Sequence, residues 1–145
     1  MISVILATYN WPQALKLCLE SLSTQTDINF EIIIADDGST SDTKDLILAT
    51  QTSFPVKLRH LWQEDQGFRK TRILNQAIES ADGEYLVFLD GDCIVQPDFI
   101  AQHRSLSEKN HLVTGSRILL NNELSKKLLS WAHWDFKKFS GNLLS

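Results

Sequence analysis

Residues 2–22 read ISVILATYNWPQALKLCLESL, and this stretch decides the fold class. Its first part, residues 2–7, is a continuous apolar run, which is typical of a strand that is buried on both faces. Asn10 is placed to cap a following helix that has Pro12 in its first turn. That helix has apolar residues at helical spacing at Leu15, Cys18, Leu19 and Leu22. A buried strand followed by an amphipathic helix predicts one unit of a parallel α/β sheet.

The same alternation of apolar runs and helical spacing continues along the chain. Further strands are predicted at 30–35, 56–62 and 85–89, helices at 41–50, 67–81 and from Pro97, an extended segment at 112–120, and a last helix from Asn121 or Asn122 toward Phe139. Residues 56–62 are less apolar and are expected nearer an edge of the sheet, whereas residues 85–89 are apolar enough for a central strand. The predicted fold class is therefore α/β, with a mostly parallel sheet flanked by helices.

The composition restricts the class of protein. The chain has 145 residues, 43% of them apolar, which suits one domain with its own core. Its formal net charge of −4 argues against nucleic acid as a partner, because nucleic-acid-binding domains usually carry a basic surplus. The 2 cysteines lack the spacing of a metal site, and the N-terminal apolar run is too short for a signal peptide or a membrane span. We therefore expect a cytoplasmic protein.

Polar clusters follow three of the predicted strands at the point where each strand ends. They are Thr8-Tyr9-Asn10, Asp36-Asp37 and Asp90-Gly91-Asp92. Ligands of open α/β sheets bind beyond the carboxyl ends of the strands. We therefore expect the three clusters to form one site.

The acidic clusters differ in the chemistry that they predict. Asp90 and Asp92 can converge on one hard cation, Mn²⁺ or Mg²⁺, because Gly91 lets the backbone turn between them. The alternative interpretation of this cluster is a solvated turn. Asp36 and Asp37 are adjacent, so their side chains diverge and do not share a metal. One of them is expected to accept a hydrogen bond from a ligand while the other caps Ser39 or the next helix.

The loop at residues 63–72, QEDQGFRKTR, places three cations among four residues at the start of a predicted helix. Lys70 and Arg72 would offset the charge of a metal-bound diphosphate, which the helix N-terminus also favours. The alternative is a solvated first helical turn.

Near its C-terminus the chain interleaves aromatic and basic residues, namely Trp131, Trp134, Phe136 and Phe139 with Lys126, Lys127, Lys137 and Lys138. This pattern allows a peripheral contact with the inner face of the membrane, and the alternative is packing on a protein core.

Four stretches together resemble the nucleotide-sugar half of a family 2 glycosyltransferase with the GT-A fold. They are ISVILATYNWPQAL (2–15), EIIIADDGSTSDT (31–43), QGFRKTRILNQAI (66–78) and GEYLVFLDGDCIVQPDFI (83–100). The resemblance covers residues 2–120. The sequences QEDQGFRK (63–70) and FLDGDCI (88–94) are most similar to a bacterial group with a galactosyltransferase-like second half.

The resemblance implies transfer of a sugar from a nucleoside diphosphate donor, with UDP favoured over GDP and dTDP, to a hydroxyl of a glycan or lipid-linked acceptor. It implies inversion at the anomeric carbon and a place in cell-surface polysaccharide synthesis. By motif, Thr8 and Tyr9 border the base, Asp37 hydrogen-bonds it and Arg72 faces the diphosphate. With the residues named above, the expected nucleotide-sugar-binding residues are Thr8, Tyr9, Asn10, Asp37, Lys70, Arg72 and Asp90. The expected ligands of Mn²⁺ or Mg²⁺ are Asp92 and Asp90, and the resemblance implies Asp92 on the metal and Asp90 near the ribose or a metal-bound water.

Members of this family are commonly much longer than this chain and carry their general base in the second half. We therefore divide the chain into a nucleotide-sugar-binding GT-A domain at residues 1–120 and the helical start of an incomplete acceptor-side half at residues 121–145. No catalytic base is assigned, although Asp135 is a candidate. We expect half an active site, with the apolar faces of residues 112–120 and of the helix around Trp131 exposed, and self-association or aggregation through them.

The sequence leaves two other functions as alternatives. A nucleotide-sugar-binding fragment without turnover is the stronger alternative. A haloacid-dehalogenase-type phosphatase is weaker, because its aspartate motif normally follows the first strand and because Cys93-Ile94 fits that motif poorly.

Overall fold

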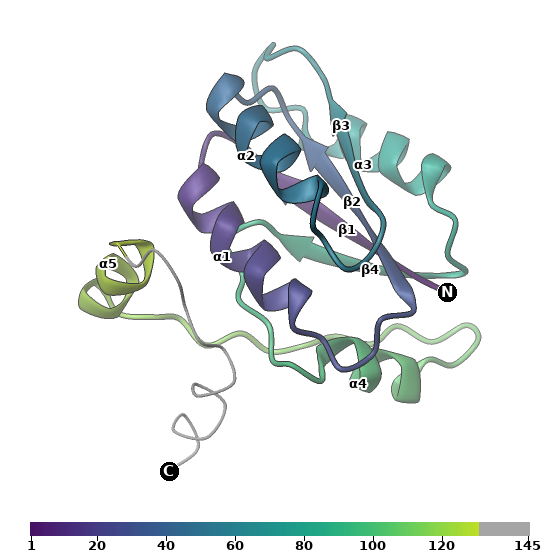
Figure 1. Ribbon diagram of the computed structural model, residues 1–145. Coiled ribbons are helices and arrows are strands. Elements are labelled where there is room, and N and C mark those ends of the chain that lie inside the picture. Colours follow the sequence, from purple (N-terminus) through teal and green to yellow (C-terminus); the bar gives the residue numbers. More distant parts are fainter. Residues whose placement is uncertain (131–145) are drawn as a thin grey trace.

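A computed structural model describes residues 1–130 of the chain. The elements are β1 (Ile2–Thr8), α1 (Pro12–Ser23), β2 (Phe30–Asp36), α2 (Ser41–Gln51), β3 (Leu58–Trp62), α3 (Lys70–Ser80), β4 (Tyr85–Asp90), α4 (Phe99–Leu106) and α5 (Asn122–Ser130) (Figure 1). The four strands form one parallel sheet in the order β3-β2-β1-β4. This architecture confirms the predicted α/β fold class.

Helices cover both faces of the sheet, as expected where β1 and β2 are buried along almost their whole length (Figure 1). On one face, Val4 and Leu6 of β1 pack in a core with apolar residues of α1, α2 and α4. On the other face, Ile5 packs with Ile73 and Ala77 of α3. Alternate residues of one strand therefore enter two cores, which holds β1 in the middle of the molecule.

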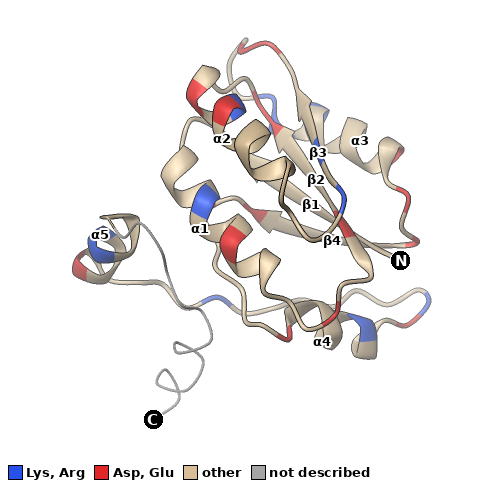
Figure 2. Cartoon of the chain, viewed as in Figure 1, with Lys and Arg blue, Asp and Glu red and all other residues tan. Residues whose placement is uncertain are grey.

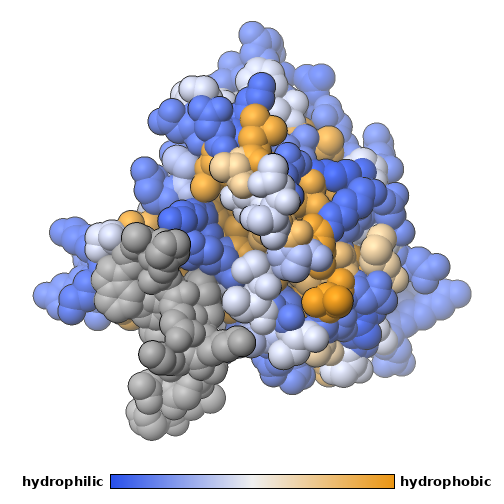
Figure 3. Space-filling view, in the orientation of Figure 1, coloured by the Kyte–Doolittle hydropathy of each residue, from blue (hydrophilic) through white to orange (hydrophobic). Residues whose placement is uncertain are grey.

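The charged residues lie mainly on the helices, in the loops and at the strand ends (Figure 2). β1 contains none. In the view of Figure 3, apolar surface lies in the middle of the face and polar surface surrounds it.

β4 differs from the prediction of a central strand. Among the described residues it pairs with β1 alone and is an edge strand. Val87 is buried, but Phe88 is 55% exposed because no described helix or strand covers it. Residues 111–121, which include the expected extended segment, form neither helix nor strand.

The predicted cap of α1 is also wrong. Asn10 has a φ of 47° and its side chain makes no cap hydrogen bond to α1, which begins at Pro12. The Asn10 side-chain oxygen instead accepts a hydrogen bond from the Thr40 backbone N–H (2.9 Å), and the Asn10 N–H donates to Ser39 Oγ (2.9 Å). Asn10 therefore links the loop after β1 to the loop after β2.

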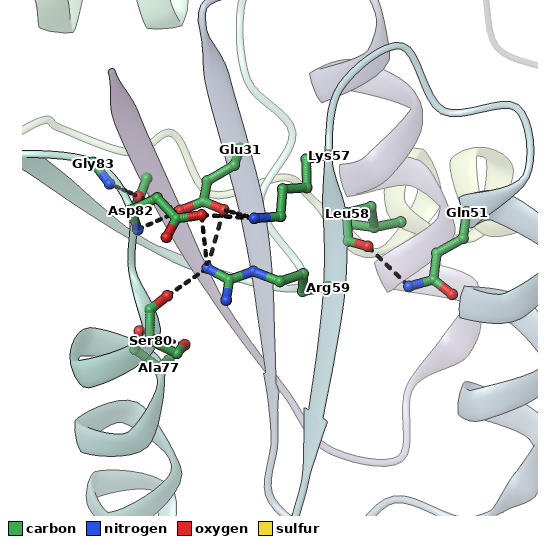
Figure 4. Close-up of polar contacts among 10 residues, drawn as sticks. Glu31, Gln51, Lys57, Leu58, Arg59, Ala77, Ser80, Asp82 and Gly83 are labelled. Carbon is green, nitrogen blue, oxygen red and sulfur yellow. Dashed lines mark hydrogen bonds and ion pairs between the residues drawn. The ribbon is translucent and has the colours of Figure 1, made fainter.

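A buried ionic network holds the amino ends of the strands together (Figure 4). Glu31 of β2 is fully buried, and its Oε1 accepts hydrogen bonds from Ser3 Oγ (2.7 Å) and from the Asp82 N–H (2.8 Å). Its Oε2 accepts from Arg59 Nη2 at 3.0 Å and lies 3.8 Å from Lys57 Nζ. The network thus connects β1, β2 and β3 with the loop between α3 and β4. It lies at the amino ends of the strands, whereas the polar clusters lie at their carboxyl ends.

Candidate functional site

A cavity of about 380 Å³ lies beyond the carboxyl ends of β1, β2 and β4. It is lined by Ala7, Thr8, Tyr9, Trp11, Ala14, Asp37, Asp65, Gly67, Phe68, Lys70, Asp90, Gly91 and Asp92. Six of the eight candidate binding residues are therefore brought together at the carboxyl ends of the strands. Asn10 and Arg72 do not line the cavity, and Arg72 is exposed.

Gly91 sets the position of the two neighbouring aspartates. Its backbone N–H donates a hydrogen bond to the Ala7 carbonyl at 2.7 Å, so the chain turns directly over the end of β1. A Cβ at this position would lie 2.9 Å from that carbonyl oxygen. A glycine is therefore required for Asp90 and Asp92 to lie against β1.

Asp36 has a structural role. It is fully buried, its Oδ1 accepts a hydrogen bond from the Ser39 N–H (2.8 Å), and its Oδ2 lies 2.9 Å from His60 Nε2. The expectation that one of the paired aspartates caps Ser39 is confirmed, and Asp36 is that residue.

Asp37 lies in the wall of the cavity with both carboxylate oxygens engaged. Oδ1 accepts from Gln63 Nε2 (2.5 Å), and Oδ2 accepts from the Arg69 backbone N–H (2.9 Å). The Asp37 N–H donates to the Thr8 carbonyl at 3.1 Å. Since each carboxylate oxygen has a second lone pair, Asp37 is fixed in place and still has capacity to accept from a ligand.

The loop between β3 and α3 contributes residues that the sequence reasoning missed. Asp65 Oδ2 accepts a hydrogen bond from the Tyr9 hydroxyl (2.9 Å), and this bond raises the pKa of Tyr9. Phe68 is exposed at the cavity, as is Trp11 at the start of α1. The only available signal was the polar composition of residues 63–67, which does not identify a partner on another loop.

Four carboxylates and one ammonium line the cavity, from Asp37, Asp65, Asp90, Asp92 and Lys70. Lys70 Nζ lies 2.6 Å from Asp90 Oδ1, with about a third of the lysine side chain and half of the aspartate side chain exposed (37% and 47%). Asp92 is exposed, and the Cys93 thiol lies 3.7 Å from its Oδ1. Burial and the nearby Asp92 carboxylate raise the pKa of Cys93, so this thiol stays protonated beside the acidic pair.

The donor set fits a divalent cation only together with a ligand. No group of three His, Cys, Asp or Glu side chains within residues 1–130 is arranged to hold a metal ion. Asp90 and Asp92 supply two hard oxygen donors, and Mg²⁺ is usually bound by one or two carboxylates plus substrate phosphates. The residues present therefore suit Mn²⁺ or Mg²⁺ whose remaining ligands come from a phosphate group and water.

A second, larger groove of about 1630 Å³ runs along β4, α4 and residues 107–120. It shares Trp11, Asp90 and Asp92 with the first cavity, so the acidic pair lies where the two meet. The segment from Trp131 onward, with Asp135, lies outside the described residues. Within residues 1–130, no helix has the length and apolar character needed to cross a membrane.

The family model described as glycosyl transferase family 2 matches residues 3–143. Among curated proteins, the chain is 32% identical over 99 residues to glycosyltransferase GlyA of Streptococcus pneumoniae serotype 4, covering 68% of this chain and 14% of that protein. It is 30% identical over 102 residues to validoxylamine A glucosyltransferase of Streptomyces hygroscopicus subsp. jinggangensis, covering 69% and 24%. The chain spans about a third or less of the length of the curated relatives it matches.

Solved structures share the fold. The crystal structure of Staphylococcus aureus TarS residues 1–349 in complex with UDP-GlcNAc matches with a TM-score of 0.62 and 26% identity, over 72% of this chain and 30% of that one. Mannosyltransferase PcManGT from Pyrobaculum calidifontis, in complex with GDP-Man and Mn²⁺, matches with a TM-score of 0.56 and 26% identity, over 63% of this chain and 27% of that one.

Proposed function

The chain belongs to glycosyl transferase family 2, and on this premise we propose that its cavity binds a nucleoside diphosphate sugar, with a UDP-sugar favoured. The observation that carries the proposal is the gathering of Asp37, Lys70, Asp90 and Asp92 around one cavity from three separate parts of the chain. The reaction that we propose is transfer of the sugar to a hydroxyl of a glycan or lipid-linked acceptor, with inversion at the anomeric carbon.

The base end of the nucleotide is assigned to the side of the cavity formed by Tyr9 and Asp37. Asp37 is held by Gln63 and by the Arg69 backbone, so its free lone pairs have a fixed direction. A fixed carboxylate acceptor suits a uracil N–H, because a hydrogen bond to a charged group is stronger than one between neutral groups. Thr8 and the ring of Tyr9 border the base, and Asn10 holds the loop that carries them.

The diphosphate is assigned to the side formed by Lys70, Asp90 and Asp92. Asp92 and Asp90 would hold Mn²⁺ or Mg²⁺, with Asp92 as the more exposed ligand. When bound, the cation offsets the charge of the diphosphate and favours its departure from the sugar. The Lys70 ammonium adds positive charge to the same side. We assign Arg72 to the diphosphate on the family motif alone, since its side chain is exposed outside the cavity.

In the domain division that we propose, residues 1–120 bind the nucleotide sugar and residues 121–145 begin the acceptor side. The groove beside β4 supports this division, since it adjoins Asp90 and Asp92 on the side away from the base. A base within reach of the acceptor hydroxyl is also required, and we assign none to a residue of this chain. The galactosyltransferase-like grouping, a role in cell-surface polysaccharide synthesis and a peripheral position at the inner membrane face are parts of the same proposal.

Calorimetric titration of UDP tests the proposed site. We expect UDP to bind at least about tenfold more tightly with Mn²⁺ or Mg²⁺ than in EDTA, because the diphosphate otherwise faces two carboxylates. Asp92→Ala should abolish this difference. Asp45→Ala removes the same charge from an exposed position on α2 that does not line the cavity, and it should leave the difference unchanged. Equal UDP affinity in EDTA and in Mn²⁺ would contradict the proposed metal site.

A nucleotide-sugar-binding protein without turnover is the second candidate, because the charged cavity residues of the described part of the chain are assigned to the nucleotide and the metal, and none to the general base. Incubation with radiolabelled UDP-hexoses and membrane or oligosaccharide acceptors separates the two candidates. Donor binding without transfer or hydrolysis supports the second candidate. The family match leaves the phosphatase interpretation without support.

A further inference from the structure

Lys70 occupies an unusual place for a cation. It is the first residue of α3, where the helix dipole disfavours positive charge. Its ammonium is nevertheless held in the cavity by Asp90, with 2.6 Å between Nζ and Oδ1. The contact joins residues 20 positions apart, so it belongs to the folded cavity and does not arise from the helix itself.

The other two cations of residues 63–72, Arg69 and Arg72, do not point into the cavity in this way. The Arg69 guanidinium donates through Nη2 to the Glu64 carbonyl at 2.7 Å and so is tied to its own loop. Arg72 is exposed and does not line the cavity. Of the three, Lys70 is thus the one cation in the described cavity wall. Its flexible stem and three rotatable donors let it exchange partners at little cost, which the planar guanidinium of arginine does less readily.

Under the proposed function, a divalent cation and the Lys70 ammonium therefore compete for the Asp90 carboxylate. A divalent cation at Asp90 and Asp92 and the Lys70 ammonium at 2.6 Å from Asp90 would repel each other. The diphosphate of a donor nucleotide carries the negative charge that can receive the ammonium when it leaves Asp90.

We propose that Lys70 is an exchangeable counter-ion that makes the binding of the divalent cation and of the nucleotide diphosphate mutually dependent. Without donor, the ammonium neutralises Asp90 and weakens binding of the cation alone. With donor, the ammonium moves to a phosphate oxygen and Asp90 becomes available to the cation. Because linkage is reciprocal, each ligand then raises the affinity for the other by the same factor. This inference rests on the proposed nucleotide and metal site.

The test is calorimetry on the full chain with Lys70→Met, which removes the charge and keeps most of the side-chain length. MnCl₂ alone should bind the variant about two- to fivefold more tightly than the wild type, as expected from the loss of a competing exposed ion pair. UDP in the presence of Mn²⁺ should bind it about tenfold more weakly, because a charged donor to the phosphate is lost. The two affinities should thus change in opposite directions.

Two further variants serve as controls. Lys16→Met removes a partly exposed lysine of α1 that also pairs with a carboxylate, Glu20 at 3.8 Å, and it should change neither affinity. Lys70→Arg keeps the charge but exchanges partners less readily, so it should keep part of the mutual dependence, and more of it than Lys70→Met does. The melting temperature of Lys70→Met should stay within a few degrees of the wild type, since the ion pair is exposed.

The outcomes separate the inference from the function on which it rests. If UDP binding by the wild type does not respond to Mn²⁺, the proposed metal site and this inference both fail. If the wild type responds but Lys70→Met binds Mn²⁺ alone no more tightly, or loses affinity for both ligands together, the counter-ion role of Lys70 is overturned and the proposed function stands.

Discussion

At the scale of single residues, Asp37 combines the proposed contact with the base, which the motif predicts, with a structural contact that the sequence does not reveal. Gln63 and the Arg69 N–H hold both of its oxygens, which fixes the carboxylate and connects the loop after β2 to the start of α3. The neighbouring Asp36 is buried with His60 and has no face on the cavity. Of the acidic pair, Asp37 is therefore the one that can meet a ligand.

Asp37→Asn is expected to weaken UDP binding by about 1–3 kcal/mol, because an amide N–H₂ would face a donor where a carboxylate accepted one. The same replacement sets an amide nitrogen against Gln63 or Arg69, so a modest fall in melting temperature is expected as well. Calorimetry with UDP and thermal unfolding measure the two effects.

Gln63→Ala is the matched control for this variant, because it removes one protein partner of Asp37 and leaves the carboxylate in place. It should lower the melting temperature but keep most of the UDP affinity. If Asp37→Asn bound UDP as tightly as the wild type, Asp37 would not be the acceptor for the base.

At the scale of elements, the amino ends of the strands depend on one buried carboxylate. Glu31 Oε1 receives two donors and Oε2 faces Arg59 and Lys57. Through Asp82, the network also holds the loop from which β4 begins, so it sets where that strand starts beside β1.

Glu31→Gln is expected to lower the free energy of unfolding by about 2–4 kcal/mol, because it places an amide N–H₂ against the Arg59 and Lys57 donors. UDP affinity should be nearly unchanged, since the network lies at the amino ends of the strands and the cavity lies beyond their carboxyl ends. Urea unfolding followed by circular dichroism measures the loss.

Glu20→Gln on α1 removes the same charge from a partly exposed ion pair and should cost about 0.5 kcal/mol or less. A loss for Glu31→Gln as small as that of Glu20→Gln would show that the buried network adds little net stability.

The elements also show which features are readable from sequence. The positions of β1 and β2 follow from their apolar runs, and each strand extends one residue beyond its predicted end. The close turn at Gly91 follows from the lack of a side chain at that residue. The pairing of Lys70 with Asp90 cannot be predicted from sequence in this way, because it depends on how α3 and β4 are placed relative to each other. Asn10 failed as a cap for the same reason, since its side chain is used by the neighbouring loop at Thr40.

At the scale of the whole molecule, the predicted position of β4 in the sheet differs from the observed one. Its apolar run predicted a strand with neighbours on both sides, but within residues 1–130 it pairs with β1 alone. Which strand pairs with which is decided by chain connections and not by local composition. Apolar residues of β4 and of residues 112–120 consequently line an open groove.

This groove predicts that the 145-residue chain self-associates. Leu112 and Leu119 are 89% and 82% exposed, and contiguous apolar surface of this kind drives association in water. Light scattering coupled to size-exclusion chromatography should show a mass that rises with concentration above 16.5 kDa. Leu112→Ser with Leu119→Ser should reduce that rise, whereas Leu48→Ser on α2, an exposed leucine outside the groove, should not. A wild-type chain that stays at 16.5 kDa at every concentration would contradict association through this surface.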